Sequence, residues 1–348
     1  MPNADGYIIL KRNSTSDEWE EIGQAAQRNS TSISMALDEI DKNAYYAVKA
    51  FATKNGEIAY SKYDEGFSLM NYSDENSKYR ILYFGDSITY GSPYKSNSSR
   101  HIFSIPNRVG ELLGCTFYNP SIPGSTYHDL GQKDGKNIEN GNYYRYRICR
   151  EVVDQIAEGQ LPGNWEDLDT ASNSEGINNT SIYDYNIVVL AAGTNDYLDN
   201  SILGSEDSLD TKTFNGAFNH IMEQITNASL KRIEDGKEAI KVVFVDLYYS
   251  DRCTDYTVRQ NRDTTPNKIG LTLIDYQNAL LAQYNKWESQ TEGVLSFYNF
   301  KTRDYDIVNQ ENCPYTASDN LHFTKFTYGQ YGNAFAQFLV ENVFDSEG

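Results

Sequence analysis

The fold is decided by Arg80-Ile81-Leu82-Tyr83-Phe84-Gly85-Asp86-Ser87-Ile88-Thr89-Tyr90-Gly91, in which an apolar strand runs directly into a tight polar turn. Branched and aromatic residues without polar alternation predict a strand buried on both faces, as in a parallel sheet. In open α/β sheets, chemistry gathers beyond the carboxyl ends of such strands. Ser87 lies three residues past the end of this apolar run, where a nucleophile would lie. The alternative is that Asp86 or Ser87 only caps a short helix.

Three further polar turns follow in order along the chain: Asn119-Pro120-Ser121-Ile122-Pro123-Gly124, Gly193-Thr194-Asn195-Asp196 and Asp319-Asn320-Leu321-His322. Together with Gly85-Asp86-Ser87-Ile88-Thr89, they resemble the four ordered blocks of the SGNH (GDSL-type) hydrolases. The resemblance covers residues 78–345. It departs from the common pattern at two places, where Ile88 replaces a leucine and Pro123 precedes the glycine of the second block.

The resemblance implies a serine esterase site. Ser87 is the expected nucleophile, His322 its general base, and Asp319 the acid that orients the histidine, as in a catalytic triad. The expected oxyanion donors are the backbone N–H groups of Ser87 and Gly124 and the side-chain amide of Asn195. No cofactor and no metal is expected. Each residue also has a structural alternative: Asp319 and His322 as a helix cap, Gly124 as a turn glycine, and Asn195 as an Asx-turn residue.

Apolar periodicity predicts alternating strands and helices after residue 78. This alternation, with the resemblance, predicts an α/β fold: a doubly wound five-stranded parallel sheet of the flavodoxin-like SGNH hydrolase type. A helix at 144–156 and a long polar loop at 159–180 are expected inside it. The predicted strands are 81–84, 115–118, 187–192, 242–248 and 294–298, and the predicted helices are 102–113, 214–233, 271–287 and 326–343.

Residues 1–71 differ, because short alternating strands separated by polar turns predict a small all-β, sandwich-like segment. The segment resembles the latter part of a fibronectin type III domain, and the polar residues 71–78 are predicted to be the linker to the hydrolase domain. The strands are expected at 6–12, 19–22, 31–37, 45–52 and 58–61. A full domain of this type has about seven strands. We therefore expect the natural chain to continue upstream, with an export signal that places the enzyme outside the cell or on its surface. The segment would act as a passive spacer or as a carbohydrate-binding module.

Composition excludes several classes of function. Lys plus Arg number 30 against 49 Asp plus Glu, a formal charge of −19, which argues against a nucleic-acid or anionic-membrane partner. No apolar run approaches the ~18 residues that a membrane span requires. Neither G-x-S-x-G nor H-E-x-x-H occurs, which disfavours an α/β-hydrolase and a zinc protease. The spacing of Cys115, Cys149, Cys253 and Cys313 indicates neither a disulfide framework nor a zinc site.

The substrate is predicted from the residues around the nucleophile. The chain has 28 tyrosines, among them Tyr90 and Tyr94, and aromatic faces near a site stack on sugar rings. No apolar stretch nearby is suited to a lipase lid. We expect hydrolysis of short acyl groups, above all acetyl, from carbohydrate. The alternatives are a lipase or thioesterase for longer chains and a catalytically silent carbohydrate-binding surface protein. The sequence does not define the oligomeric state. The remaining histidines, His101, His128 and His220, are weaker candidates. His220 is expected to face solvent, and His128 is expected at the surface, with a place in the pocket lining as its alternative.

Overall fold

The computed structural model describes residues 4–14, 16–25, 40–61, 67–68, 71–94, 103–121, 123–128, 181–251, 260–309 and 319–344. The chain divides into two compact units. One comprises Met1–Asn76 with Leu112–Gly114, and the other comprises Ser77–Glu111 with Cys115–Gly348.

The N-terminal unit contains an antiparallel sheet in the order β2-β1-β3-β4, with β5 paired to β3. Its strands are β1 (Gly6–Arg12), β2 (Glu20–Ala25), β3 (Tyr45–Lys54), β4 (Glu57–Tyr60) and β5 (Phe67–Ser68). Asn55 and Gly56 join β3 to β4 and both have positive φ, 56° and 85°, as a two-residue hairpin turn requires. Ile8, Leu10 and Ala47 form a small buried cluster on one face.

The described strands of the N-terminal unit differ from the expected set at two places. The predicted strand at 31–37 lies outside the described residues, and the two-residue strand β5 was not predicted, because it is too short to show periodicity. The described residues of the unit form one sheet, so the second layer of a sandwich is not seen among them.

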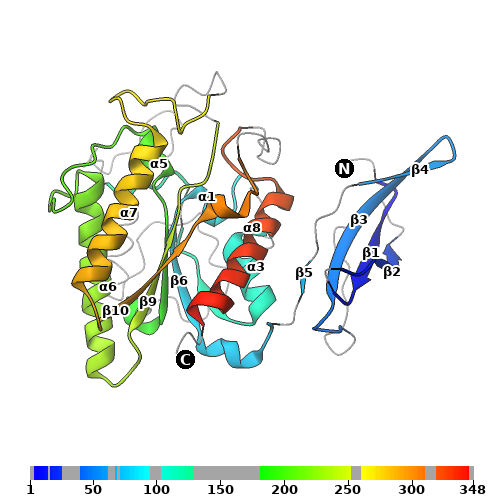
Figure 1. The fold of residues 1–348 in the computed structure, drawn as a ribbon, viewed down its shortest axis with the longest axis horizontal. Helices are drawn as coiled ribbons and strands as arrows, with labels where there is room; N and C mark the ends of the chain where they lie inside the picture. The colour runs from blue at the N-terminus through cyan, green and yellow to red at the C-terminus, as the bar shows by residue number, and fades with distance from the viewer. Residues whose placement is uncertain are drawn as a thin grey trace, which may run out of the picture. The chain divides into compact units, whose positions relative to one another are not determined.

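The second unit contains a five-stranded parallel sheet in the order β10-β9-β8-β6-β7. Numbered within this unit, the order is 2-1-3-4-5, the flavodoxin-like arrangement that the sequence predicts. Strand β6, which lies between β8 and β7, carries the turn with Ser87 at its carboxyl end (Figure 1). The strands are β6 (Arg80–Gly85), β7 (Thr116–Tyr118), β8 (Ile187–Ala191), β9 (Ile240–Val245) and β10 (Leu295–Phe300).

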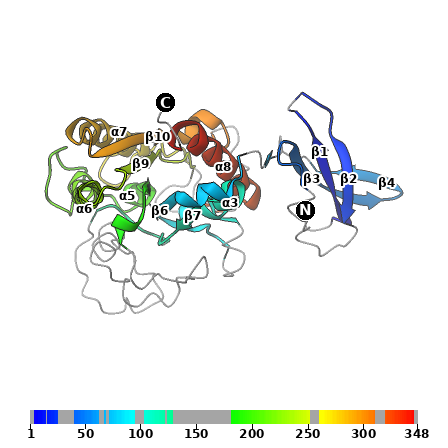
Figure 2. The same cartoon turned by 90° about the horizontal axis from the view of Figure 1, so that it is seen from below.

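Helices cover both faces of this sheet, because alternate side chains of the strands are apolar on both sides. Figure 2 shows α6 and α7 on one side and α3 and α8 on the other. The long helices are α3 (Ile105–Leu113), α6 (Phe214–Glu234), α7 (Leu273–Gln290) and α8 (Lys325–Phe338), the last continued by a π-helical turn at Leu339–Val343. Short helices α1 (Ser87–Tyr90) and α5 (Thr194–Leu198) follow β6 and β8, and 3₁₀ turns occupy Asp74–Lys78, Ile182–Asp184 and Thr302–Tyr305.

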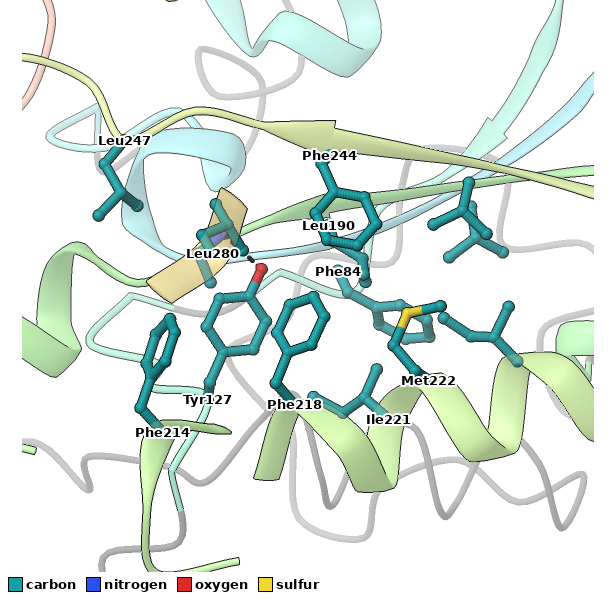
Figure 3. Close-up of a cluster of buried hydrophobic side chains, with 14 of the residues drawn as sticks. Phe84, Tyr127, Leu190, Phe214, Phe218, Ile221, Met222, Phe244, Leu247 and Leu280 are labelled. Atoms are coloured by element: carbon teal, nitrogen blue, oxygen red, sulfur yellow. Dashed lines mark hydrogen bonds between the residues drawn. The ribbon is translucent and has the colours of Figure 1, made fainter. Parts of the chain in front are cut away.

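The main core lies between the sheet and α6. Figure 3 shows Phe218 and Met222 of α6 pointing toward Phe84, Leu190 and Phe244 of the strands. On the opposite face, the rings of Tyr83 in β6 and Phe335 in α8 meet edge to face with centroids 6.3 Å apart. The sheet is therefore fixed from both sides, which gives its carboxyl edge a rigid geometry.

Most predicted elements appear within a few residues of their expected bounds. Helix α7 begins at Leu273 rather than 271, because Thr272 and Asp275 form a capping box that starts the helix there. The helix predicted at 144–156 and the loop at 159–180 lie outside the described residues. No helix in the described part of the chain is long and apolar enough to cross a membrane.

Candidate active site

The turn that carries Ser87 is closely packed by its own backbone and by neighbouring side chains. Ser87 is the first residue of α1 and is 5% exposed, and Asp86 caps the helix by accepting a hydrogen bond from the Ile88 N–H at 2.9 Å. A Cβ atom on Gly85 would lie 2.3 Å from Thr89 Oγ1 and 2.9 Å from Ser121 Oγ. Only glycine fits at that point. The short helix is thereby pressed against the strand end, and the direction of Ser87 is set by the backbone.

Asp86 is buried in this turn with little compensation for its charge. Burial raises its pKa to about 6, although the Ile88 N–H and the nearby His322 act in the opposite direction. The turn around Ser87 therefore includes a carboxyl group that titrates close to neutral pH.

The fourth block forms a closed turn around Asp319. One oxygen, Oδ1, accepts the backbone N–H groups of Leu321 at 3.1 Å and His322 at 3.0 Å. The other, Oδ2, lies 2.5 Å from Nδ1 of His322, so the ring donates its Nδ1–H to the carboxylate. Burial alone would raise the pKa of Asp319, but the hydrogen bond and charge of His322, with the two N–H donors, hold it well below its ordinary value. Asp319 is thus ionised and fixes both the orientation and the tautomer of His322.

The other ring nitrogen of His322 is available for chemistry. Nε2 is buried, and no atom of the described residues forms a hydrogen bond to it. Ser250 Oγ, beyond β9, donates to the Asn320 carbonyl of this block at 2.5 Å. Tyr328 OH of α8, the helix that follows the block, donates to the Ser92 carbonyl just after α1 at 2.6 Å. Ser87 Oγ does not itself bond Nε2 in this structure. Such catalytic hydrogen bonds often tighten only once substrate is bound.

The second and third blocks are brought together at the same edge of the sheet. Gly124 adopts a φ of 87°, which favours glycine and lets the backbone approach a substrate closely. Asn195, 8% exposed in α5, donates from Nδ2 to the Ser125 carbonyl at 2.8 Å. An amide nitrogen carries two hydrogens, so one N–H of Asn195 is left for an oxyanion.

The structure also shows a buried polar cluster that the sequence did not predict. His128 was expected at the surface, but it is 5% exposed, and its Nδ1 lies 2.9 Å from Oδ1 of Asp196. The surface expectation for His128 was wrong, because its carboxylate partner stands 68 residues away in the sequence. The available signal was Asp196 itself, a charged residue directly after a buried apolar strand and Asn195. His220 is half-buried on α6, against the expectation of a surface position, and His101 lies outside the described residues.

In the described ranges, His, Cys, Asp and Glu side chains form no group of three or more suited to a metal ion. Cys115 is a free, buried thiol whose pKa is raised to about 12 by burial, and the other three cysteines fall outside those ranges.

Comparison with known proteins decides the family. The family model for GDSL-like lipase/acylhydrolase matches residues 81–335, well over half of the chain. The chain belongs to this family. It is accordingly a carboxylic ester hydrolase of the SGNH group. A search of curated proteins found no match.

Several solved structures are similar to this GDSL hydrolase. A protein from Lactobacillus plantarum is 15% identical, with 76% of this chain and 98% of that chain covered and a TM-score of 0.50, a likeness of fold alone. A GDSL-like lipase from Bacteroides thetaiotaomicron is 14% identical, covering 78% and 92% with a TM-score of 0.37. A family two carbohydrate esterase from Clostridium thermocellum, in complex with cellohexaose, is 12% identical, covering 98% and 87% with a TM-score of 0.41.

Proposed function

We propose that this hydrolase cleaves esters through Ser87 and His322 without a metal ion. The observation that carries the proposal is the state of His322, whose Nδ1–H is held by Asp319 while the buried Nε2 has no hydrogen-bond partner among the described residues. A histidine fixed in this way accepts a proton at Nε2 only, which is what a nucleophilic serine requires.

The reaction follows from these positions. Ser87 Oγ attacks the acyl carbon and passes its proton to Nε2 of His322, which then returns it to the leaving alcohol. In the second half, water attacks the acyl carbon and gives a proton to Nε2 of His322. The histidine returns this proton to Ser87 Oγ as the acyl–oxygen bond breaks, which releases the acid and free Ser87. The negative oxygen of each tetrahedral intermediate would be bound by the N–H groups of Ser87 and Gly124 and by Nδ2 of Asn195. Each such donor contributes about 3 kcal/mol to transition-state stabilisation in comparable enzymes.

Substitution of Ser87 tests the mechanism. We expect Ser87→Ala and His322→Gln to lower kcat on p-nitrophenyl acetate at least about 10³-fold, because neither step proceeds without the nucleophile or its base. Ser289→Ala, at an exposed position near the end of α7, is the matched control and should retain full activity. Activity should also survive EDTA. Wild-type activity in Ser87→Ala, or loss of activity with EDTA, would contradict the mechanism.

We propose short acyl groups, above all acetyl, on carbohydrate as the substrate. Supporting this is the aromatic surface beyond α1, where the half-buried Tyr94 pairs with Phe103 at a centroid distance of 5.5 Å. Nζ of Lys325 lies 4.2 Å from the Phe103 ring centroid, so the surface also offers a polar donor for sugar hydroxyls. The N-terminal sheet would be a fibronectin type III-like spacer or carbohydrate-binding module.

Two measurements test the proposed substrate. One is the relative kcat/KM on p-nitrophenyl esters with acyl chains from C2 to C12, and the other is the release of acetate from acetylated xylan and other glycans. We expect the C2 ester to be preferred and acetate to be released from at least one glycan. A preference for C8 or longer esters with no acetate release would favour a lipase or thioesterase instead. Inactivity toward all of these substrates would favour a silent carbohydrate-binding protein.

A further inference from the structure

The loop that carries Gly124 is bound to α5 in part through one buried carboxylate, that of Asp196. We define the oxyanion loop as residues 123–128. Asp196, which is 0% exposed, accepts the Tyr127 N–H on Oδ2 at 2.9 Å and the His128 N–H on Oδ1 at 3.1 Å. Two successive backbone donors therefore point at one side chain, and the C-terminal half of the loop has its path set by Asp196.

Two side chains complete the environment of this carboxylate. His128 donates its Nδ1–H to Oδ1 at 2.9 Å, and the Ser201 hydroxyl donates to the same oxygen at 3.2 Å. His128 and Ser201 are 5% and 2% exposed, and they contact each other directly. A buried carboxylate costs several kcal/mol unless it is hydrogen-bonded, and these four donors supply that compensation. The cluster is itself anchored, because Tyr276 OH of α7 donates to the Ser201 carbonyl at 2.5 Å.

Although the cluster contains a serine, a histidine and an aspartate, its geometry does not suit a second nucleophilic site. In a catalytic triad the acid and the serine bond opposite ring nitrogens of the histidine. Here Asp196 and Ser201 both contact Nδ1 of His128, and Ser201 Oγ lies farther from Nε2, at 3.3 Å, than from Nδ1. Ser201 is also enclosed. The arrangement fits a structural clamp.

The clamp lies next to both of the non-serine oxyanion donors. Asp196 directly follows Asn195 in α5, and Asn195 Nδ2 bonds the Ser125 carbonyl of the same loop at 2.8 Å. We propose that Asp196, together with His128 and Ser201, is a positioning device that holds the Gly124 N–H and the Asn195 amide at a fixed mutual distance for the oxyanion. This inference rests on the proposed function, because it assigns Gly124 and Asn195 their role in the transition state.

A double-mutant cycle between Asp196 and Asn195 tests the device. The carboxylate of Asp196 accepts hydrogen bonds from two backbone N–H groups of the loop. In Asp196→Asn the amide nitrogen is a donor and cannot accept, so the loop loses at least one of these hydrogen bonds. We expect kcat on p-nitrophenyl acetate to fall about tenfold or more, with KM changed less than about twofold, since displacement of an oxyanion donor weakens transition-state binding. In an Asn195→Ala background the same substitution should cost much less, because the oxyanion site is already damaged.

Asp184→Asn is the matched control. Asp184 also binds a backbone N–H, that of Ser181 at 2.8 Å, but it lies at the amino end of β8, away from the site. It should lower the Tm without changing kcat. If Asp196→Asn does not fold, Ser201→Ala and His128→Asn take its place in the double-mutant cycle. The asparagine of His128→Asn keeps an N–H donor close to the position of Nδ1. We therefore expect His128→Asn to retain more activity than His128→Leu.

The outcomes separate the two proposals. Two results would overturn the positioning role while leaving Ser87 as the nucleophile. The first is a lowered Tm with unchanged kcat in Asp196→Asn. The second is a double variant whose loss of kcat equals the product of the losses in Asp196→Asn and Asn195→Ala. Undiminished activity in Ser87→Ala would overturn the proposed function and the positioning role together.

Discussion

At the scale of single residues, two carboxyl groups of the site are shifted in opposite directions by their surroundings. Asp319 accepts three N–H groups, including that of a histidine ring, and its pKa is held low. Asp86 is more deeply buried and has a pKa of about 6. Asp319 therefore stabilises the fold above about pH 4, and this contribution is lost as the pH falls and the carboxylate is protonated. Asp86 has a raised pKa, so it destabilises the fold as the pH rises and its carboxyl group ionises.

Asp86→Asn should change the free energy of unfolding in a pH-dependent way. The folded pKa of about 6 exceeds the unfolded value near 3.9, so wild type loses stability as the pH rises through about 4 to 6, whereas the asparagine variant does not. Asparagine also remains a good N-cap. We expect similar stability at pH 4 and an advantage for Asp86→Asn of up to about 3 kcal/mol at pH 8. Urea midpoints at both pH values measure this, with exposed Asp304→Asn as the control. An equal difference at both pH values would contradict the shifted pKa.

At the scale of elements, short helices α1 and α5 at the carboxyl ends of β6 and β8 bring Ser87 and Asn195 to one edge of the sheet. This placement was predictable from the sequence, because each apolar strand ends in a short polar turn. The clamp of Asp196 and His128 was not, because it depends on a contact between residues 68 positions apart. Local patterns specify where a strand ends. They do not specify which distant loop a buried side chain will bind.

Helix α8 offers a test of close packing with its own internal control. A Cβ atom on Gly332 would lie 2.5 Å from Cγ of Arg108 in α3, whereas one on Gly329 would meet nothing within 4 Å. We expect Gly332→Ala to lower stability by about 1–3 kcal/mol through overpacking, and Gly329→Ala to raise it by about 0.5–1 kcal/mol through helix propensity. Thermal or urea unfolding of the two variants decides this. Stabilisation by both substitutions would show that α3 and α8 are less closely packed than the structure indicates.

At the scale of the whole molecule, the chain combines an antiparallel β unit with a family-typical hydrolase unit. The order of the parallel sheet was predictable, since alternating strands and helices with four ordered blocks leave few topologies open. The number of layers in the N-terminal unit was harder to predict from the sequence. Antiparallel strands that alternate apolar and polar residues have one apolar face each, but this pattern does not reveal what covers that face. The substrate preference of the hydrolase unit likewise depends on side chains that meet only in the folded surface. Single tyrosines in the sequence therefore indicate this preference only indirectly.

The central claim is that Ser87, activated by His322, is the nucleophile. The most direct measurement is the mass and position of the adduct formed with an alkyl phosphonate ester, read by intact-protein and peptide mass spectrometry. We predict one adduct, on the peptide containing Ser87, formed with loss of activity, absent in Ser87→Ala and strongly slowed in His322→Gln. An adduct on another residue that accompanies inactivation, or full inactivation of Ser87→Ala by the same reagent, would contradict the claim.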